Sequence, residues 1–163
     1  MDRRFLENTG FIRQTGCCAF MNLKQIMTSP VISVEPEESV EVAARTLEHY
    51  NIGALPVCRG GRLYGVVTDR DLVIRCLACG KDPAKTPVRE VMTTRVISAR
   101  SDMDTAVAAS LMGREKVRRL PVVENGIVRG IVSLGDIANV EQNVYDAADA
   151  LGEISSQTPQ SFT

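Results

Sequence analysis

The sequence predicts an α/β fold made of two tandem βαββα repeats, which pack as two small mixed sheets about a pseudo-two-fold axis. The first observation is an internal repeat: residues 26–72 align without a gap on residues 91–137, at an offset of 65. The second is that, within each repeat, β-branched runs alternate with helical apolar stripes. Two repeats are too few for a solenoid, which needs about three stacked units. We therefore expect the repeats to close on one another and to share a crevice.

The two repeats carry the same short motifs in the same order. The matched motifs, first repeat then second, are Met27-Thr28 and Met92-Thr93, Val31-Ile32-Ser33 and Val96-Ile97-Ser98, Val42-Ala43-Ala44 and Val107-Ala108-Ala109, Leu55-Pro56-Val57 and Leu120-Pro121-Val122, and Gly65-Val66-Val67-Thr68 and Gly130-Ile131-Val132-Ser133. We place the first repeat at residues 26–84 and the second at residues 91–145. Before, between and after them we expect an N-terminal extension (residues 1–25), a linker (85–90), and a C-terminal helix and tail (146–163).

The first half of each repeat predicts a strand and then a helix. Val31–Val34 is a β-branched run that ends before Pro36, which is typical of a strand. Ser39 then precedes an amphipathic helix whose apolar stripe follows helical spacing. The stripe residues are Val40, Ala43, Ala44 and Leu47 in the first repeat, and Val107, Ala108, Leu111 and Met112 in the second.

The second half predicts a hairpin and a second helix. The first hairpin strand of each repeat opens at Leu55-Pro56 or Leu120-Pro121. Proline is tolerated there because it lies at the start of the strand. The turns Gly60-Gly61 and Asn125-Gly126 consist of residues that accept a positive φ. A helix follows each hairpin, over 69–79 in the first repeat, where Gly80 is a stop signal, and from Leu134 in the second. Beyond it, Val144, Ala147, Ala148 and Leu151 predict either an extension of that helix or one further helix, which covers the core or a dimer face.

Composition excludes several classes of function. The chain has 163 residues, a net charge of −1 and no Trp, so it has neither the basic charge nor the aromatic platforms of a nucleic-acid-binding protein. No apolar run approaches the roughly 18 residues of a membrane span. Five scattered cysteines do not form a disulfide framework. We therefore expect a cytoplasmic protein without a membrane or nucleic-acid partner. Residues 1–20 have no counterpart in the repeat, and Met21 is a candidate natural start.

The sharpest pattern is a hydroxyl followed three residues later by an acid. It occurs as Thr68 and Asp71 in the first repeat, and as Ser133 and Asp136 in the second. One interpretation is a capping box, which satisfies free N–H groups at a helix start. The other is a ligand site, because a strand that leads into a helix N-terminus suits a phosphate and a nearby Asp can accept both ribose hydroxyls. The local sequence leaves both open.

Together these motifs resemble the cystathionine β-synthase (CBS) domain, and the tandem pair resembles a Bateman module of the kind found in small stand-alone bacterial CBS-pair proteins. The resemblance covers residues 26 to 143. It implies a non-catalytic sensor that binds an adenosine-containing ligand, such as AMP, ADP or ATP, between the repeats. It places ribose and phosphate contacts at Thr68, Asp71, Ser133 and Asp136. Adenine contacts are implied near Ile32, Ser33, Gly53, Ala54, Ile97 and Ser98.

Three arginines are candidates for phosphate charge, because arginine recognises phosphate through two parallel hydrogen bonds. They are Arg70, Arg118 and Arg119, and a solvated surface face is the alternative. Arg70 corresponds to Gly135, and Arg118-Arg119 correspond to Gly53-Ala54. The two crevice sites should therefore differ in affinity.

Cys76 and Cys79 form a lone C-x-x-C motif near a helix end. A redox site would lie at a helix start, and a single histidine, His49, provides few further metal ligands. Ordinary packing explains these cysteines better, and a thiol or zinc sensor is the alternative.

No nucleophile–base pair, metal motif or phosphate loop occurs at a meaningful spacing, so we expect neither an enzyme, nor a metal site, nor a required cofactor. The leading hypothesis is a regulatory module whose ligand, an adenine nucleotide, shifts the arrangement of the repeats or of a homodimer. An effector protein would read that arrangement. The rival is an interaction module that has kept the fold and lost the ligand.

Overall fold

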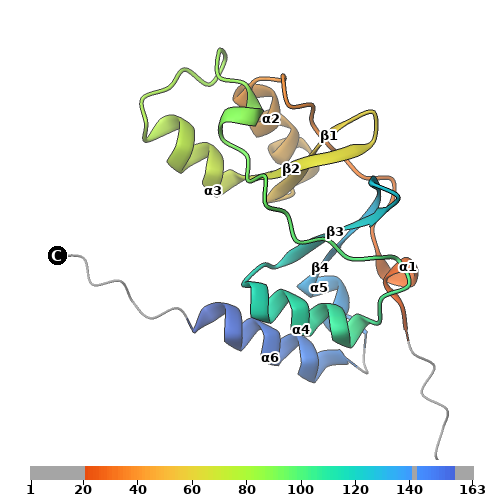
Figure 1. Cartoon of the computed structure of the whole chain (residues 1–163). Helices are drawn as coiled ribbons and strands as arrows, with labels where there is room; N and C mark the ends of the chain where they lie inside the picture. Colours follow the sequence, from red (N-terminus) through yellow and green to blue (C-terminus); the bar gives the residue numbers. More distant parts are fainter. Residues whose placement is uncertain (1–20, 141–142, 157–163) are drawn as a thin grey trace, which may run out of the picture.

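The computed structural model describes residues 21–140 and 143–156 (Figure 1). Residues 1–20, which include most of the predicted extension, and residues 157–163 of the predicted tail lie outside the described residues. The first repeat contains α2 (Val40–Tyr50), β1 (Ala54–Arg59), β2 (Arg62–Thr68), α3 (Asp69–Asp71) and the π-helix η1 (Leu72–Leu77). The second contains α4 (Thr105–Glu115), β3 (Arg119–Glu124), β4 (Ile127–Ser133) and α5 (Leu134–Ala138). The short helices α1 (Leu23–Ile26) and η2 (Val88–Glu90) precede the repeats, and α6 (Val144–Ser155) follows the second.

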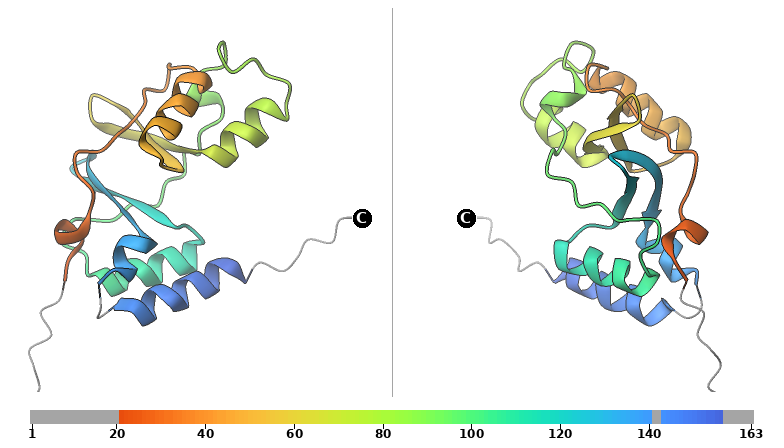
Figure 2. Two further views of the ribbon diagram at one scale, coloured as in Figure 1. Left: turned by 180° about the vertical axis from the view of Figure 1, so that it is seen from behind. Right: turned by 45° about the vertical axis from the view of Figure 1, so that its right-hand side comes forward.

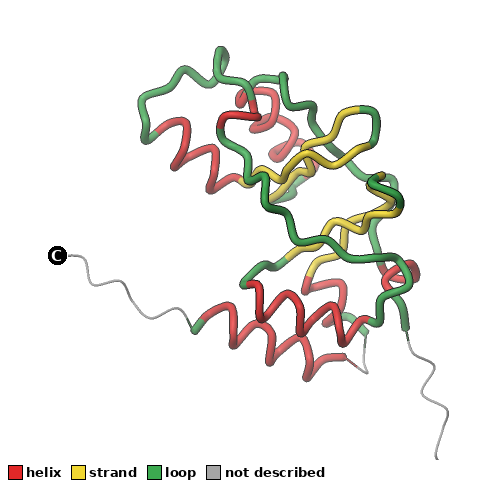
Figure 3. The backbone as a smooth tube through the Cα atoms, in the orientation of Figure 1, coloured by secondary structure: helices red, strands yellow, loops and turns green. Residues whose placement is uncertain are grey.

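The strands form one antiparallel sheet in the order β1-β2-β4-β3. Each repeat contributes one hairpin, drawn in yellow in Figure 3. The hairpins join at a single residue pair, Arg62 with Ile127. The predicted pair of small sheets is therefore connected at one point between β2 and β4. The internal symmetry extends to irregularities, because the register shifts after Val57 in β1 and after the equivalent Val122 in β3.

The predicted first strand of each repeat is reduced to one parallel bridge. Val34 pairs with Val57, and Ala99 pairs with Val122. The segments cannot extend further because they cross between the repeats: Thr28 bridges Ile131 of the second repeat, only six residues before Val34 joins the first. In the same way Thr93 bridges Val66. Each repeat is thus entered by a segment that is anchored on the other repeat.

The turn residues behave as the sequence predicts. Gly60 and Gly61 have φ values of 56° and 78°, and Asn125 and Gly126 have values of 52° and 78°. These left-handed pairs match the two-residue hairpin turn whose twist suits antiparallel strands. The helical segment of the first repeat ends at Leu77, and Gly80 follows with φ 67°, as expected of a helix stop.

Each repeat buries its own apolar cluster. The first is centred on Leu55, Val57 and Val67, and the second on Leu120, Val132 and Met112. The stripe predicted for α2 holds except that Ala44 is exposed. The stripe predicted for α4 is wrong at Val107, which is 56% exposed, because the buried face of α4 is rotated toward α6. That face consists of Thr105, Ala108, Ala109, Met112 and Gly113.

Helix α6 lies beside α4 and α5 and covers the second repeat's core (Figure 2). It buries Ala147, Ala150 and Ile154, so only Ala147 of the predicted stripe faces the core. Gly113 makes this approach possible, because a Cβ there would lie 3.1 Å from the Ala150 Cα. Within residues 21–140 and 143–156, no helix is long and apolar enough to cross a membrane.

Candidate functional site

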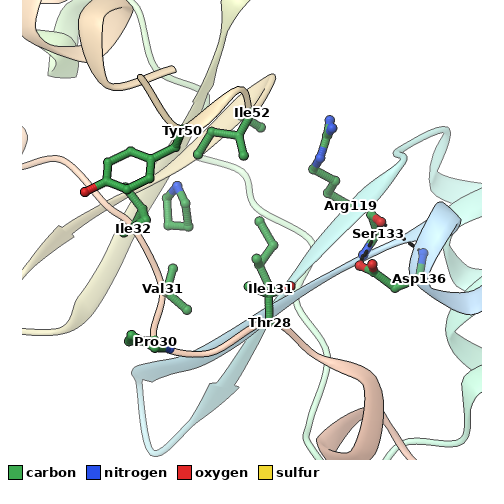
Figure 4. A pocket seen from close by; sticks show the side chains of 12 residues that line it. Thr28, Pro30, Val31, Ile32, Tyr50, Ile52, Arg119, Ile131, Ser133 and Asp136 are labelled. Atoms are coloured by element: carbon green, nitrogen blue, oxygen red, sulfur yellow. Dashed lines mark hydrogen bonds between the residues drawn. The ribbon is translucent and has the colours of Figure 1, made fainter. Parts of the chain in front are cut away.

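Two cavities open between the repeats, and residues from both repeats line each of them. The Asp136 cavity, of about 370 Å³, is lined by Thr28, Pro30, Val31, Ile32, Tyr50, Ile52, Ala54, Pro56, Arg119, Ile131, Ser133 and Asp136 (Figure 4). The Asp71 cavity, of about 180 Å³, is lined by Ala54, Val66, Thr68, Asp71, Thr93, Arg95, Val96, Ile97, Val117, Arg119, Pro121 and Ile131.

The 65-residue offset relates the two cavities almost residue by residue. Ile32, Ser133 and Asp136 in one correspond to Ile97, Thr68 and Asp71 in the other. Each cavity combines the hydroxyl–acid pair of one repeat with the entry segment of the opposite repeat. This arrangement follows from the crossing segments, since Thr28 and Thr93 are held on the hairpin that ends in the facing hydroxyl. The repeat has therefore duplicated a composite site.

Both hydroxyl–acid pairs are complete capping boxes. Thr68 Oγ1 accepts a hydrogen bond from the Asp71 N–H at 3.1 Å, while Asp71 Oδ2 accepts bonds from the Thr68 N–H and hydroxyl at 3.0 and 2.7 Å. In the second repeat the Ser133 N–H and hydroxyl each bond Asp136 Oδ2 at 2.7 Å. These bonds hold the carboxylates rigidly at the ends of β2 and β4.

The capping box uses only one oxygen of each carboxylate. Asp71 Oδ1 lies 3.5 Å from Arg75 Nε, and among the described residues no donor bonds Asp136 Oδ1. The remaining oxygen can therefore accept hydrogen bonds from a ligand without disturbing the cap. The two interpretations that the sequence left open are compatible in one structure.

The predicted arginines lie in three different places. Arg119 lines both cavities, whereas Arg118 lines only a groove between α5 and α6, which shares Arg119 and Ser133 with the Asp136 cavity. Arg70 is exposed and lines neither cavity. The cavities also differ at positions that sequence reasoning missed: Arg95 in one replaces Pro30 in the other.

The remaining predicted contacts divide in the same way. Ile32, Ile97 and Ala54 line the cavities, whereas Ser33 and Ser98 are exposed and line neither. Gly53 lies next to the cavities, with a position for its Cβ 3.6 Å from an Arg119 guanidinium nitrogen. Tyr50, Ile52 and Val117 are apolar or aromatic wall residues that no short motif marks.

Comparison with known families decides the classification. The family model of the CBS domain matches residues 23–77 and 88–143. The chain belongs to the CBS domain family. It is a tandem CBS pair, a regulatory module of the kind expected from the repeated motifs.

Curated and solved relatives agree with this assignment. The CBS domain-containing protein YhcV of Bacillus subtilis is 40% identical over 136 residues, which cover 83% of this chain and 96% of that protein. The crystal structure of Hypoxic Response Protein I with two coordinated zinc ions matches with a TM-score of 0.69 and 33% identity, covering 74% of this chain and 98% of that one. The CBS domain pair of protein MJ0100, in complex with 5′-methylthioadenosine and S-adenosyl-L-methionine, matches with a TM-score of 0.68 and 30% identity over 77% of this chain and 98% of that one.

Cys76 and Cys79 of the CBS pair each contact a different backbone carbonyl. Cys76 is buried with its Sγ 3.6 Å from the Lys81 carbonyl oxygen, and the exposed Cys79 directs its Sγ to the Ile74 carbonyl oxygen at 3.4 Å. Burial raises the pKa of the Cys58 thiol, although the Ser33 hydroxyl opposes this effect. In the part of the chain that the structure describes, no three His, Cys, Asp or Glu side chains gather as a metal site.

We expect native alkylation to separate these thiols, because only an accessible thiol reacts readily. Iodoacetamide should modify Cys79 in the folded protein and leave Cys58 and Cys76 unmodified until denaturant is added. Peptide mass mapping before and after unfolding measures this difference. Equal native labelling of Cys76 and Cys79 would contradict the packing interpretation and favour a thiol sensor.

Proposed function

We propose that this CBS pair is a non-catalytic sensor of an adenosine-containing nucleotide, which it binds in the Asp71 and Asp136 cavities. The supporting observation is the duplicated composite site, in which a fixed carboxylate at the end of a strand faces an apolar wall from the other repeat. The carboxylate oxygen outside the capping box, which pairs with Arg75 in Asp71 and has no donor among the described residues in Asp136, suits the two hydroxyls of a ribose, and the wall suits an adenine ring. The adenosyl ligands bound by the MJ0100 pair lend support to the same ligand class.

Signalling follows from the way the cavities are built. A ligand that contacts both repeats binds best when the repeats lie at one particular distance from each other. It therefore shifts the population toward that arrangement. We further propose that a homodimer, or an effector protein that contacts it, reads the change. The exposed apolar side chains of η1, Val73, Ile74 and Leu77, are candidates for that contact surface.

Thermal unfolding in the presence of adenosine, AMP, ADP, ATP, NAD and S-adenosylmethionine tests the proposal. A ligand at about 100 times its Kd should stabilise the protein by about 2.7 kcal/mol. The double variant Asp71→Asn, Asp136→Asn should lose this response, because an amide binds ribose hydroxyls more weakly than a carboxylate does.

Two controls make the result specific. Asp82→Asn removes a carboxylate from an exposed loop outside both cavities and should respond like the natural sequence. GTP tests whether the wall selects adenine. No shift with any compound would contradict the proposed function and favour the interaction module. An undiminished shift in the double variant would contradict the proposed site, because the ligand would then bind elsewhere.

A further inference from the structure

One arginine is positioned to serve both cavities. Arg119, at the start of β3, lines the Asp71 cavity and the Asp136 cavity alike. Its symmetry equivalent, Ala54, also lines both, but has no charge. The internal symmetry that provides two carboxylates therefore provides only one cation at this position. Figure 4 shows the Arg119 side chain extending from its strand toward Ile52 of the first repeat.

The guanidinium of Arg119 lies at the boundary between the repeats. Two of its nitrogens lie 3.6 and 3.8 Å from the position of a Cβ on Gly53, and Asp69 Oδ2 lies 3.6 Å from that same point. Gly53 has no side chain to block this passage, whereas its equivalent in the second repeat is Arg118. The ion pairs formed among the described residues do not include Arg119, and its side chain is exposed. The cation is thus accessible from either cavity.

We propose that the two sites compete for Arg119, so that anionic nucleotides bind with negative cooperativity. This inference rests on the proposed function. A guanidinium that forms two parallel bonds to one phosphate cannot form the same pair to a phosphate in the other cavity. The first nucleotide takes the arginine, and the second binds without it.

The order of binding follows from the second difference between the cavities. Arg95 lines the Asp71 cavity, and the equivalent wall residue of the Asp136 cavity is Pro30. The Asp71 cavity therefore combines its own cation with the shared one, and a phosphate fills it first. The Asp136 cavity is the weaker site once Arg119 is engaged. Losing a charged hydrogen-bonded partner corresponds to a Kd ratio of about 10 or more.

Calorimetric titration of the full chain with AMP and with ATP tests the competition. The natural sequence should show two Kd values that differ about 10-fold or more. In Asp71→Asn the remaining Asp136 cavity should bind more tightly than the second site of the natural sequence, because Arg119 is free. If the Asp136 cavity is weaker only because of its own lining residues, its Kd should be the same in Asp71→Asn as in the natural sequence. This result would overturn the proposal.

Two further variants and one ligand complete the test. Ala54→Arg restores an arginine to each repeat and should bring the two Kd values together. Arg119→Ala should weaken phosphate-bearing ligands at the first site and leave the second Kd near its natural value, because the second nucleotide already binds without the arginine. If Ala54→Arg does not fold, the Asp71→Asn comparison still decides. Adenosine has no phosphate and should show no coupling, so an equal Kd ratio for adenosine and AMP would overturn the proposal. Two equal, independent AMP sites would refute the competition alone, whereas no heat with any nucleotide or adenosine would refute the proposed function as well.

Discussion

Leu120→Ala should lower the free energy of unfolding by about 2–5 kcal/mol, and Leu55→Ala should do the same. Both leucines are fully buried, and they occupy equivalent positions at the centres of the two apolar clusters. Truncation removes favourable burial and leaves a cavity that the surrounding strands can fill only in part. Urea denaturation followed by circular dichroism measures both free energies.

The same experiment tests whether the repeats have separate cores. Leu55 and Leu120 belong to different clusters, so the double variant should lose the sum of the two single losses within about 0.5 kcal/mol. Leu151→Ala is the matched control, because Leu151 is 46% exposed and its truncation should cost no more than about 0.5 kcal/mol. A cost for Leu120→Ala as small as that of the control would show that the second cluster is not packed as described.

The fold was largely predictable because short local motifs specify its helices and turns, and the same motifs occur in both repeats. The hairpin turns depend on residues that accept positive φ, and both pairs adopt it. The apolar stripe of α4 was predictable only in part: Val107 was wrongly placed on the buried face, because α6 packs from a direction that no local pattern specifies. Val31–Val34 has the composition of a strand, yet it forms one bridge because the segment must cross between the repeats. This crossing is a feature of the tertiary structure, and the local sequence does not indicate it.

The site was predictable in its parts and not in its assembly. Thr68 with Asp71 and Ser133 with Asp136 stand out as local motifs, and both are fixed as capping boxes. Nothing local indicates that Ile32 belongs with Asp136, because that pairing depends on the bridge from Thr28 to Ile131. A residue-by-residue comparison at the 65-residue offset could have found Arg95, since it replaces Pro30 where the rest of the segment is alike.

Gly65→Ala should destabilise the protein by about 1–3 kcal/mol, because the added methyl has no room. A Cβ at Gly65 would lie 2.7 Å from Met92 Sδ and 2.9 Å from the Thr93 carbonyl oxygen. The same oxygen accepts the Val66 N–H at 3.0 Å, and the Thr93 N–H donates back to the Val66 carbonyl at 2.8 Å. The methyl group must therefore displace the backbone that anchors the second repeat's entry segment on the first repeat. This loss should weaken ligand binding in the Asp71 cavity along with stability.

Comparison with two other glycines isolates the cause. At Gly130 the nearest atoms belong to the Met27 side chain alone, so Gly130→Ala should cost less than Gly65→Ala, because a flexible thioether can move where a carbonyl cannot. Gly152 lies within α6 with no neighbouring atom within 4 Å of its Cβ position, and alanine there should stabilise the helix by about 0.5–1 kcal/mol. Urea denaturation of the three variants gives the order directly. If Gly130→Ala proves the more damaging, crowding of a side chain costs more than displacement of the backbone bridge, and the explanation given for Gly65→Ala is wrong.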